Sequence, residues 1–385
     1  MAAFDDLRTT LEALEKRQLY RRRRLVESPA GREIVVGGRR LLNFCSNDYL
    51  GLAADERVRA AFHTGVERWG VGTGASHLVS GHTSAHHELE EALADVTARP
   101  RALLFGSGYA ANLGTINALL GPGDYVFEDR LNHASLLDGG WLSRAGFEWF
   151  GHKDVGDLEA GLAAVTDSKH RKLIVSDGTF SMDGDLCPLP ALVATARRNN
   201  AWLMIDDAHG CGVHGTGGCG VVDPAVHGTA DVPVLVGTLG KAFGTAGAFV
   251  AGEEALIETL VQRARNYIYT TAMPAAVAVA TLESLRIARA EEWRRDRLRE
   301  LIARFRAGAA ELGLKLLPSA TPIQPLLVGE SGAALRLSAT LDEKGLLVPA
   351  IRPPTVPAGT ARLRITFSAL HELADVDRLL AGLSG

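Results

Sequence analysis

The chain has 385 residues, of which 46% are hydrophobic and 22% are charged. These values are ordinary for globular proteins, and the length favours two domains over one small core. The net charge of −4 argues against a nucleic-acid-binding protein, which would carry a basic surface. The N-terminal segment has no apolar signal core, and no apolar run reaches the ~18 residues that a membrane span needs. We therefore expect a soluble, cytoplasmic protein.

The spacing of cysteine and histidine gives no indication of a metal site. The four cysteines form no C-x-x-C pair, which argues against a structural zinc site and against a disulfide framework. Free thiols suit a reducing compartment. His82 and His86 form an i, i+4 pair beside His87, but there is no H-E-x-x-H motif and no third ligand at a suitable spacing. We therefore expect no bound metal.

The first predicted element is an amphipathic helix from residue 4 to about residue 24, because apolar residues recur there at helical spacing. The basic run 21–24 would form its polar end. A β-rich stretch follows at 33–36 and 40–44, around a turn at Gly37-Gly38.

From about residue 100, short apolar runs alternate with helical patterns. This alternation predicts a doubly wound α/β domain with a mainly parallel, seven-stranded sheet. The predicted strands are 101–105, 124–128, 147–150, 172–176, 201–206, 234–238 and 247–251.

After Met273-Pro274 we predict a helix at 275–286 and a charged helix at 291–312. Two further strands and two further helices indicate a smaller α+β domain, with strands at 323–328 and 362–367 and helices at 332–344 and 371–383. The predicted parts are an N-terminal helix and β segment at 1–45, a large α/β domain at 46–285 and a small C-terminal domain at 286–385.

Two of the predicted strands end in polar residues that suit pyridoxal phosphate (PLP). The first strand breaks into Asp206-Asp207-Ala208-His209, and the second into Thr238-Leu239-Gly240-Lys241. In a parallel sheet these breaks lie at one edge, where open α/β sheets bind ligands. PLP needs an amine for its aldehyde, a carboxylate for its ring nitrogen and donors for its phosphate. Because side chains alternate along a strand, Asp206 and Asp207 point to opposite sides, and we assign the ring contact to Asp206. The alternative is that Asp206 caps the next segment and His209 is a hydrogen-bonded core residue.

The segment Gly106–Asn112 follows a strand and opens an apolar helix, which is typical of a phosphate site. It also fits the dinucleotide fingerprint G-x-G-x-x-A, so this segment alone does not distinguish PLP from NAD. His133 follows another strand and could stack on a planar ring, or Asn132 could simply cap a helix there. Arg362 and Arg364 share one face of a predicted strand, where one of them could bind a substrate carboxylate.

Taken together, these segments resemble the α-oxoamine synthases, PLP enzymes of the fold-type-I aminotransferase class. The resemblance runs almost from end to end of the chain. The strings that carry it are Asn43–Gly51, His77–Gly81, Asn132–Ser135, Phe180–Asp185, Asp206–Gly210, Gly240–Gly244 and Tyr269–Pro274.

The resemblance implies a role for each matching residue. Lys241 would bond covalently to PLP, Asp206 would pair with the ring nitrogen and His133 would stack on the ring. The ring hydroxyl would be held by His209 and Ser181. The phosphate would be held by Ser107, Gly108, Tyr109 and Thr238, and by Thr271 of a second subunit in a homodimer. The substrate would be bound by Arg364, Asn47 and Arg21.

The string Ile351–Pro357 favours the branch of this family that joins L-alanine to pimeloyl-CoA or a pimeloyl carrier protein. The products would be 8-amino-7-oxononanoate, CoA and CO2, in biotin biosynthesis. Alternatives are a sibling enzyme that joins glycine to acetyl-CoA, another α-oxoamine synthase such as a 5-aminolevulinate synthase, an NAD-dependent dehydrogenase built on the Gly106 loop, and a PLP-binding protein without catalysis.

Overall fold

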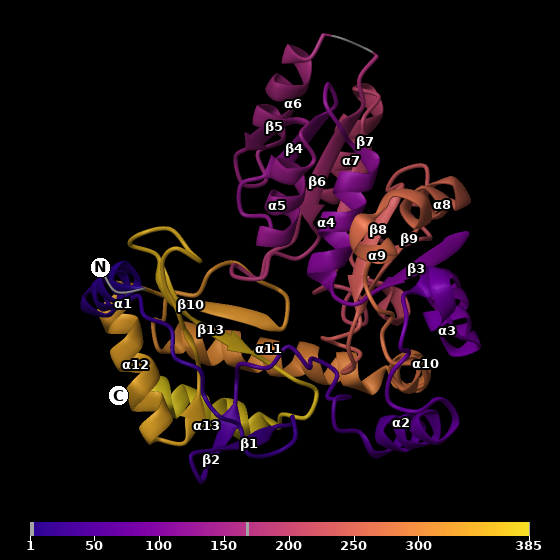
Figure 1. The fold of residues 1–385 in the computed structure, drawn as a ribbon. Helices are drawn as coiled ribbons and strands as arrows, with labels where there is room; N and C mark the ends of the chain where they lie inside the picture. The colour runs from indigo at the N-terminus through magenta and orange to yellow at the C-terminus, as the bar shows by residue number, and fades with distance from the viewer. Residues whose placement is uncertain (1–3, 167–168, 385) are drawn as a thin grey trace. The chain divides into compact units, whose positions relative to one another are not determined.

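The computed structural model describes residues 4–166 and 169–384 (Figure 1). The chain divides into two compact units. The large unit comprises Leu50–Ser181 and Asp185–Arg295, and the small unit comprises Met1–Tyr49, Met182–Gly184 and Asp296–Gly385. The predicted three-part division stays a prediction, because these units are defined by packing alone. Among the described residues, no helix is both long and apolar enough to cross a membrane.

The large unit is built on a seven-stranded sheet, which confirms the predicted α/β class. Its strand order is β3-β9-β8-β7-β6-β4-β5, and only β9 runs antiparallel to its neighbours. The strands are β3 (Arg101–Phe105), β4 (Tyr125–Asp129), β5 (Gly146–Phe150), β6 (Lys172–Asp177), β7 (Trp202–Asp206), β8 (Val234–Thr238) and β9 (Ala248–Gly252). All seven lie within one or two residues of the predicted ranges.

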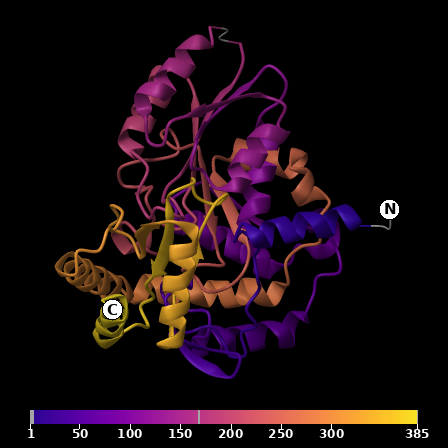
Figure 2. The same ribbon diagram turned by 90° about the vertical axis from the view of Figure 1, so that its left-hand side faces the viewer.

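Helices cover both faces of this sheet, because successive side chains of its buried strands point to opposite sides (Figure 2). In β7, Met204 joins the hydrophobic core on one face, whereas Leu203 and Ile205 join the core on the other face. The first core includes residues of α4 (Gly108–Leu119), α5 (Ala134–Leu142) and α8 (Glu254–Arg263), and the second includes residues of α6 (Val155–Ala164) and α7 (Leu189–Arg198).

The other helical segments of the large unit precede or follow the strands. They are α2 (Glu56–Trp69), the π-helical turn η1 (His77–Gly81), α3 (Ser84–Val96), the 3₁₀ turn η2 (Thr216–Gly218), α9 (Arg265–Ile268) and α10 (Ala275–Ala290).

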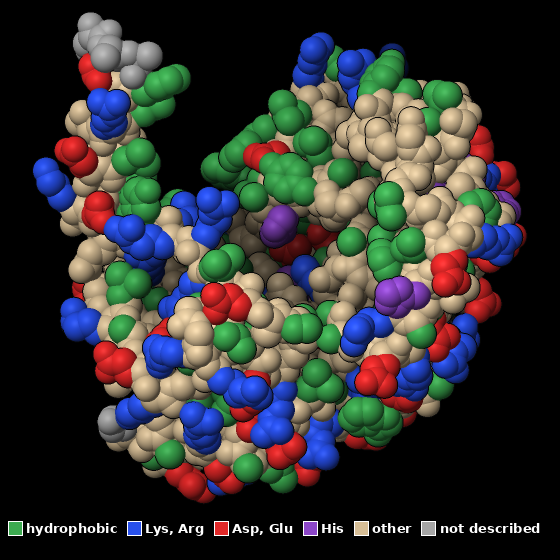
Figure 3. Space-filling view, turned by 60° about the horizontal axis from the view of Figure 1, so that its bottom comes forward, with side chains coloured by type: hydrophobic (Ala, Val, Ile, Leu, Met, Phe, Trp, Pro, Cys, Tyr) green, Lys and Arg blue, Asp and Glu red, His purple; other side chains and the backbone are tan. Residues whose placement is uncertain are grey.

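On the face shown in Figure 3, acidic and basic side chains are interspersed, so the surface there carries charges of both signs.

The small unit contains two three-stranded sheets. One has the order β1-β2-β11 and the other β10-β13-β12. Their strands are β1 (Glu33–Val36), β2 (Arg39–Asn43), β11 (Leu346–Leu347), β10 (Ile323–Gly329), β13 (Ala361–Thr366) and β12 (Ala350–Ile351). The helices are α1 (Asp5–Lys16), most of α11 (Trp293–Glu311), α12 (Ser331–Glu343) and α13 (Leu373–Leu383). Gly37 and Gly38, with φ of 56° and 72°, form the predicted turn between β1 and β2.

The predicted helix over residues 4–24 is wrong beyond Lys16. Gln18 has a φ of 57°, and the amides of Gln18 and Leu19 bond back to the last helical carbonyls. A left-handed residue of this kind ends a helix. The basic run 21–24 is therefore not a helix end. Within it, Arg22 pairs with Glu15 and Arg24 pairs with Asp342.

Candidate active site

The carboxyl ends of five strands of the large unit meet at one edge of the sheet (Figure 1). Residues with polar side chains lie at these strand ends. These strands, β3, β4, β6, β7 and β8, run in the same direction. Each is followed by, or ends in, a residue with a polar side chain: Ser107, His133, Asp177, Asp206 and Thr238. The edge therefore holds most of the predicted cofactor residues, as the parallel topology requires.

Asp206 ends β7 and is only 5% exposed. Its Oδ2 accepts a hydrogen bond from Asn112 Nδ2 at 2.6 Å, and its Oδ1 accepts from the Ala208 amide at 2.9 Å. These bonds fix the carboxylate beside α4. Asn112 was not predicted as a site residue, although it closes the string Gly106–Asn112.

Asp207 lies in a different environment, as strand alternation predicts. Its Oδ2 accepts from the Val221 amide at 2.7 Å, and a Cβ added at Gly210 or Gly220 would lie within 2.0 Å of its carboxylate oxygens. Complete burial raises the pKa of Asp207 to about 8. Asp207 is thus enclosed by the loop after β7, which supports the choice of Asp206 as the ring contact.

His133 follows β4 at the same edge. Its amide donates to Asp177 Oδ2 at 2.8 Å, and its Nδ1 lies 2.7 Å from Ser135 Oγ. Burial lowers the pKa of His133, the negative charge of Asp206 opposes this effect and the positive charge of Lys241 adds to it. His133 is therefore within electrostatic reach of both Asp206 and Lys241.

Asp177 is a further residue of this edge that the sequence analysis missed. It is the last residue of β6, and its Cα pairs with that of Asp206 in β7. Burial, followed by the negative charge of Asp206, raises its pKa well above the usual value. The signal was present, because the apolar run 172–176 ends in this aspartate in the same way that the run before Asp206 does.

The N-terminus of α4 forms an open cradle. Ser107 is its N-cap, and its Oγ accepts from the Ala110 amide at 3.2 Å. A Cβ added at Gly106 or Gly108 would meet no atom within 4 Å, so the space over the first turn is open. A helix start with free amides in open space suits a phosphate. The hydroxyl of Tyr109 bonds to Asp138, so any contact of Tyr109 with a phosphate there would come from its backbone.

Lys241 lies in the tight connection between β8 and β9 and is partly buried. Its carbonyl accepts from the Gly244 amide at 2.9 Å. Gly244 has a φ of 65°, and a Cβ there would lie 2.3 Å from the Ala53 amide nitrogen, so the turn packs directly against the backbone of residues 52–53. This packing fixes the place of the lysine at the strand ends.

The remaining predicted cofactor residues of the large unit have the following positions. Thr238 ends β8 and is buried, and its Oγ1 bonds to Gly247 O at 3.1 Å. His209 is 7% exposed and lies three residues beyond Asp206. Ser181 is partly buried. Thr271 is exposed and forms an antiparallel bridge with Ser76.

In the small unit, the two arginines of β13 have different partners. Arg362 forms an ion pair with Asp183 and donates to Thr360 O at 3.1 Å. Arg364 donates to the uncharged amide oxygen of Asn47 at 3.2 and 3.3 Å. The contacts of Arg362 are those of a structural residue, whereas Arg364 is held in place by a neutral partner.

Arg21 lines a pocket of about 270 Å³ in the small unit, together with Arg352, Pro353 and Thr355. Burial, followed by the positive charge of Arg21, lowers the pKa of Arg352. Two guanidinium groups thus lie close enough to repel each other at this pocket. The string Ile351–Pro357, singled out by the resemblance, forms part of the wall.

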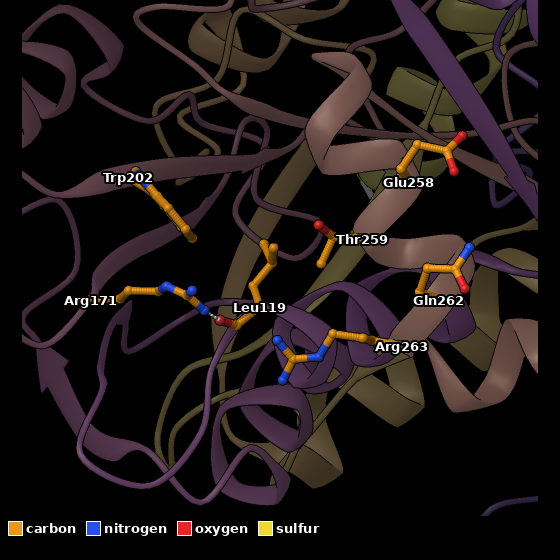
Figure 4. A pocket seen from close by; sticks show the side chains of 7 residues that line it. All are labelled: Leu119, Arg171, Trp202, Glu258, Thr259, Gln262 and Arg263. Atoms are coloured by element: carbon orange, nitrogen blue, oxygen red, sulfur yellow. Dashed lines mark hydrogen bonds between the residues drawn. The ribbon is translucent and has the colours of Figure 1, made fainter.

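A pocket of about 350 Å³ in the large unit lies at the opposite ends of the strands (Figure 4). Its lining includes Leu119 at the end of α4 and Trp202 at the start of β7. Arg171, just before β6, donates to Leu119 O at 2.7 Å and stacks over the Trp202 ring at 5.4 Å. This pocket therefore lies at the amino ends of the strands, away from the edge that carries the polar residues.

Comparison with known proteins gives a consistent result. A family model described as aminotransferase class I and II matches residues 39–383. The chain is 62% identical over 373 residues to the 8-amino-7-oxononanoate synthase of Nitrosococcus oceani, with 97% of this chain and 98% of that protein covered. It is 60% identical over 379 residues to the 8-amino-7-oxononanoate synthase of Pseudomonas syringae pv. tomato, with 98% and 95% covered.

A solved structure is also similar along its length. It is a variant of serine palmitoyltransferase from S. paucimobilis with bound PLP–myriocin aldimine. The TM-score is 0.93 at 31% sequence identity, and the match covers 99% of this chain and 96% of that chain.

Proposed function

Since the chain belongs to the class I and II aminotransferase family, and within it to the α-oxoamine synthases, we propose that it condenses L-alanine with a pimeloyl thioester. The products are 8-amino-7-oxononanoate, CO2 and the free thiol of CoA or of a carrier protein. The observation that supports this most strongly is the identity of 60% to 62%, over nearly the full length, with proteins named for that product.

The cofactor is PLP, and the residues at the sheet edge fit its groups. Asp206 is a buried carboxylate fixed by Asn112 and Ala208, which suits a protonated ring nitrogen. The open cradle at Gly108 suits the phosphate. A dinucleotide could use the same cradle, but it would leave Lys241 and Asp206 without a role. When bound, PLP supplies an electron sink that stabilises a carbanion at the substrate α-carbon.

Each residue at this edge has a distinct task in the proposal. Lys241 would hold the cofactor covalently and then, once displaced by alanine, would take the α-proton on its Nζ. Asp206 would keep the ring nitrogen protonated. His133, whose pKa is lowered at this edge, would stack on the ring. The ring hydroxyl would be held by His209 and Ser181, and the phosphate by Ser107, Gly108, Tyr109 and Thr238.

Arg364 is our proposed ligand of the alanine carboxylate. A guanidinium can form two parallel hydrogen bonds with a carboxylate. Arg362 already pairs with the carboxylate of Asp183, whereas Arg364 bonds to the amide of Asn47. The Arg364 guanidinium also bonds to the Tyr49 hydroxyl. Exchanging neutral acceptors such as these costs less than breaking an ion pair, so Arg364 is better suited to exchange partners when substrate binds.

The pocket at Arg21 and Arg352 supports the choice of acyl donor. A pimeloyl chain carries a carboxylate at the end that does not react. Two neighbouring guanidinium groups that repel each other would both be stabilised by such an anion. The sibling enzyme that uses glycine would transfer an acetyl group, which is uncharged and could not form an ion pair with these guanidinium groups.

We further propose a homodimer with shared active sites, in which Thr271 reaches the phosphate bound by its partner. Thr271 is exposed, and its segment is tied to residues 75–76 by the bridge to Ser76 and by a hydrogen bond from the Ala272 amide to Ala75 O at 2.9 Å. A side chain that is exposed on a fixed backbone is available to a second copy of the chain.

Steady-state kinetics with L-alanine and glycine, each against a panel of acyl-CoA donors, test the proposed function. We expect the highest kcat/KM for alanine with pimeloyl-CoA. The single methyl group of alanine is worth only about 1–3 kcal/mol, so the acyl donor should be the sharper filter. The highest value for glycine with acetyl-CoA would contradict the proposal and assign the sibling activity instead.

A further inference from the structure

A cluster of histidines at the start of α3 lies apart from the strand ends described above. We propose that His82, His87 and Glu90 bind a divalent transition-metal ion of the zinc class. One potential ligand atom from each of these residues lies within 4.8 Å of the other two. The third ligand, which the sequence analysis failed to find, is Glu90.

The helix brings two of these residues onto one face. His87 and Glu90 are three residues apart within α3, so their side chains are neighbours on its surface. His82 lies just before Thr83, the N-cap residue of α3. His82 Nε2 is 3.9 Å from Glu90 Oε2, which is too long for a hydrogen bond. Two ligands on one tetrahedral zinc ion lie roughly 3.3–3.6 Å apart, so a small rotation of the exposed imidazoles closes the site.

Glu90 is the anchor of the cluster. It is 8% exposed, and its Oε1 accepts from the Leu104 amide at 3.0 Å, which fixes the carboxylate and leaves Oε2 directed toward His82. Burial raises the pKa of Glu90 to about 7. A buried carboxylate of this kind is stabilised as an anion by a cation at its second oxygen.

His77 supplies an outer contact of the kind that orients metal-binding histidines. Its Nδ1 lies 2.9 Å from His82 Nδ1, so one of the two nitrogens carries the shared proton. When His82 Nδ1 is the donor, its Nε2 holds a lone pair that points toward Glu90. Ligating histidines commonly donate their other ring N–H in this way.

His86 is excluded as a ligand although it belongs to the same run. Its Nδ1 accepts from the Thr83 amide at 3.1 Å, and its Nε2 lies 2.8 Å from Met273 O. Both of its ring nitrogens are thus engaged in structural bonds. His87 Nε2 lies 3.4 Å from Glu91 Oε1, but both side chains are exposed, and such a pair is worth too little to hold His87 away from a metal.

Two imidazoles and one carboxylate leave a fourth position open on a tetrahedral ion. This donor set suits Zn²⁺. It also suits Co²⁺, Ni²⁺ and Cu²⁺, of which Cu²⁺ should bind most tightly. It does not suit Ca²⁺ or Mg²⁺, which prefer oxygen ligands. Mg²⁺ is therefore the natural negative control.

The test is calorimetric titration of the tag-free, PLP-loaded protein with Zn²⁺, together with the visible absorption of added Co²⁺. We expect one Zn²⁺ per chain with micromolar or tighter affinity, a tetrahedral Co²⁺ spectrum, and no binding of Mg²⁺. The variants His82→Gln, His87→Gln and Glu90→Gln should each lose at least tenfold in Zn²⁺ affinity. The matched control is His63→Gln, which changes an exposed histidine of α2 and should leave the affinity unchanged.

His87 is exposed, so His87→Gln tests the site without a risk to folding. If His87→Gln bound Zn²⁺ as tightly as the unaltered protein, or if the unaltered protein bound no stoichiometric Zn²⁺, the proposal would be overturned. The cluster would then be a hydrogen-bonded network of histidines with Glu90.

Discussion

Asp177 and Asp206 end two neighbouring parallel strands, and their Cα atoms are register partners. Two buried carboxyl groups therefore lie side by side at the edge that we assign to the cofactor, and the charge of Asp206 helps to raise the pKa of Asp177. One of the two is held by Asn112, and the other accepts the amide of His133. The two carboxyl groups thus link Asp206, the proposed partner of the ring nitrogen, to His133, the residue proposed to stack on the ring.

This arrangement predicts different effects for the two amide substitutions. Asp206→Asn should lower kcat by about a thousandfold or more, because an amide cannot keep the ring nitrogen protonated. Asp177→Asn retains an acceptor for the His133 amide and removes a neighbouring negative charge, so it should lower kcat by less than about tenfold. Single-turnover kinetics with L-alanine would measure both. Equal losses in the two variants would contradict the separate roles.

For Lys241 we expect that Lys241→Ala abolishes turnover but still binds PLP noncovalently through the cradle at α4. Borohydride reduction of the unaltered protein, followed by peptide mapping, should place the cofactor label on Lys241. A label on Lys153 or Lys172 would show that the site is assigned to the wrong lysine.

Substitutions of the two arginines of β13 should affect different properties, substrate binding for Arg364 and thermal stability for Arg362. Arg364→Ala should lower kcat/KM for alanine by about 2–5 kcal/mol in transition-state free energy, because it removes the proposed partner of the substrate carboxylate. Arg362→Ala should instead lower the melting temperature, because it leaves Asp183 without its ion pair. Kinetics and thermal unfolding of both variants check this. A larger kinetic loss for Arg362→Ala would reverse the assignment.

Subunit mixing tests the shared active site. Lys241→Ala and Thr271→Glu should each be inactive alone, since the first lacks the base and the second places a negative charge at the partner's phosphate. Refolding them together should restore part of the activity, because one site of each mixed dimer carries neither change. Sedimentation of the active enzyme as a monomer would rule out sharing.

Buried acids predict how stability depends on pH. Burial raises the pKa values of Glu128 and Asp207 to about 8. Each of these groups binds more protons in the folded chain than in the unfolded chain between about pH 5 and pH 8. The free energy of unfolding should therefore fall as pH rises through this window, by up to about 1.4 kcal/mol per pH unit for each group.

Glu128→Gln should remove one such contribution, because an amide has no charged form to bury and can still accept from Asn132. Urea unfolding at pH 6 and pH 8, at a fixed saturating PLP concentration, would measure the change in slope. The exposed Glu67→Gln provides a matched control. An unchanged slope in Glu128→Gln would show that this carboxyl group does not titrate in the window.

The sequence predicts the sheet well because its strands are buried on both faces and end abruptly in polar residues. Residues 202–206 and 234–238 illustrate this, and the same breaks reveal Asp206 and Thr238. Asp177 escaped because the predicted strand stopped one residue early, at Ser176. The helix at residues 4–24 was extended too far because the left-handed Gln18 has no signature in hydrophobic spacing.

Glu90, the third potential ligand beside His82 and His87, was missed for a different reason. The search for a third ligand followed metal-binding motifs, whereas Glu90 is separated from His87 by one helical turn and from His82 by the helix start. An H-x-x-E pattern on a predicted helix would have indicated the pair. Its burial beside Leu104 could not have been foreseen, because that contact joins α3 to β3.

Because β9 runs antiparallel to β8, the connection that carries Lys241 differs from the other connections of the sheet in how it tolerates insertions. Parallel strands are joined by long crossovers, which can accept insertions far from the sheet. The chain passes from β8 to β9 as a hairpin instead, with Thr238 and Ala248 as its innermost partners, so Lys241 lies in a connection of nine residues that also packs against residues 52–53. Evolution can therefore lengthen the connections that carry the substrate-facing loops, but the segment with the lysine must keep its length.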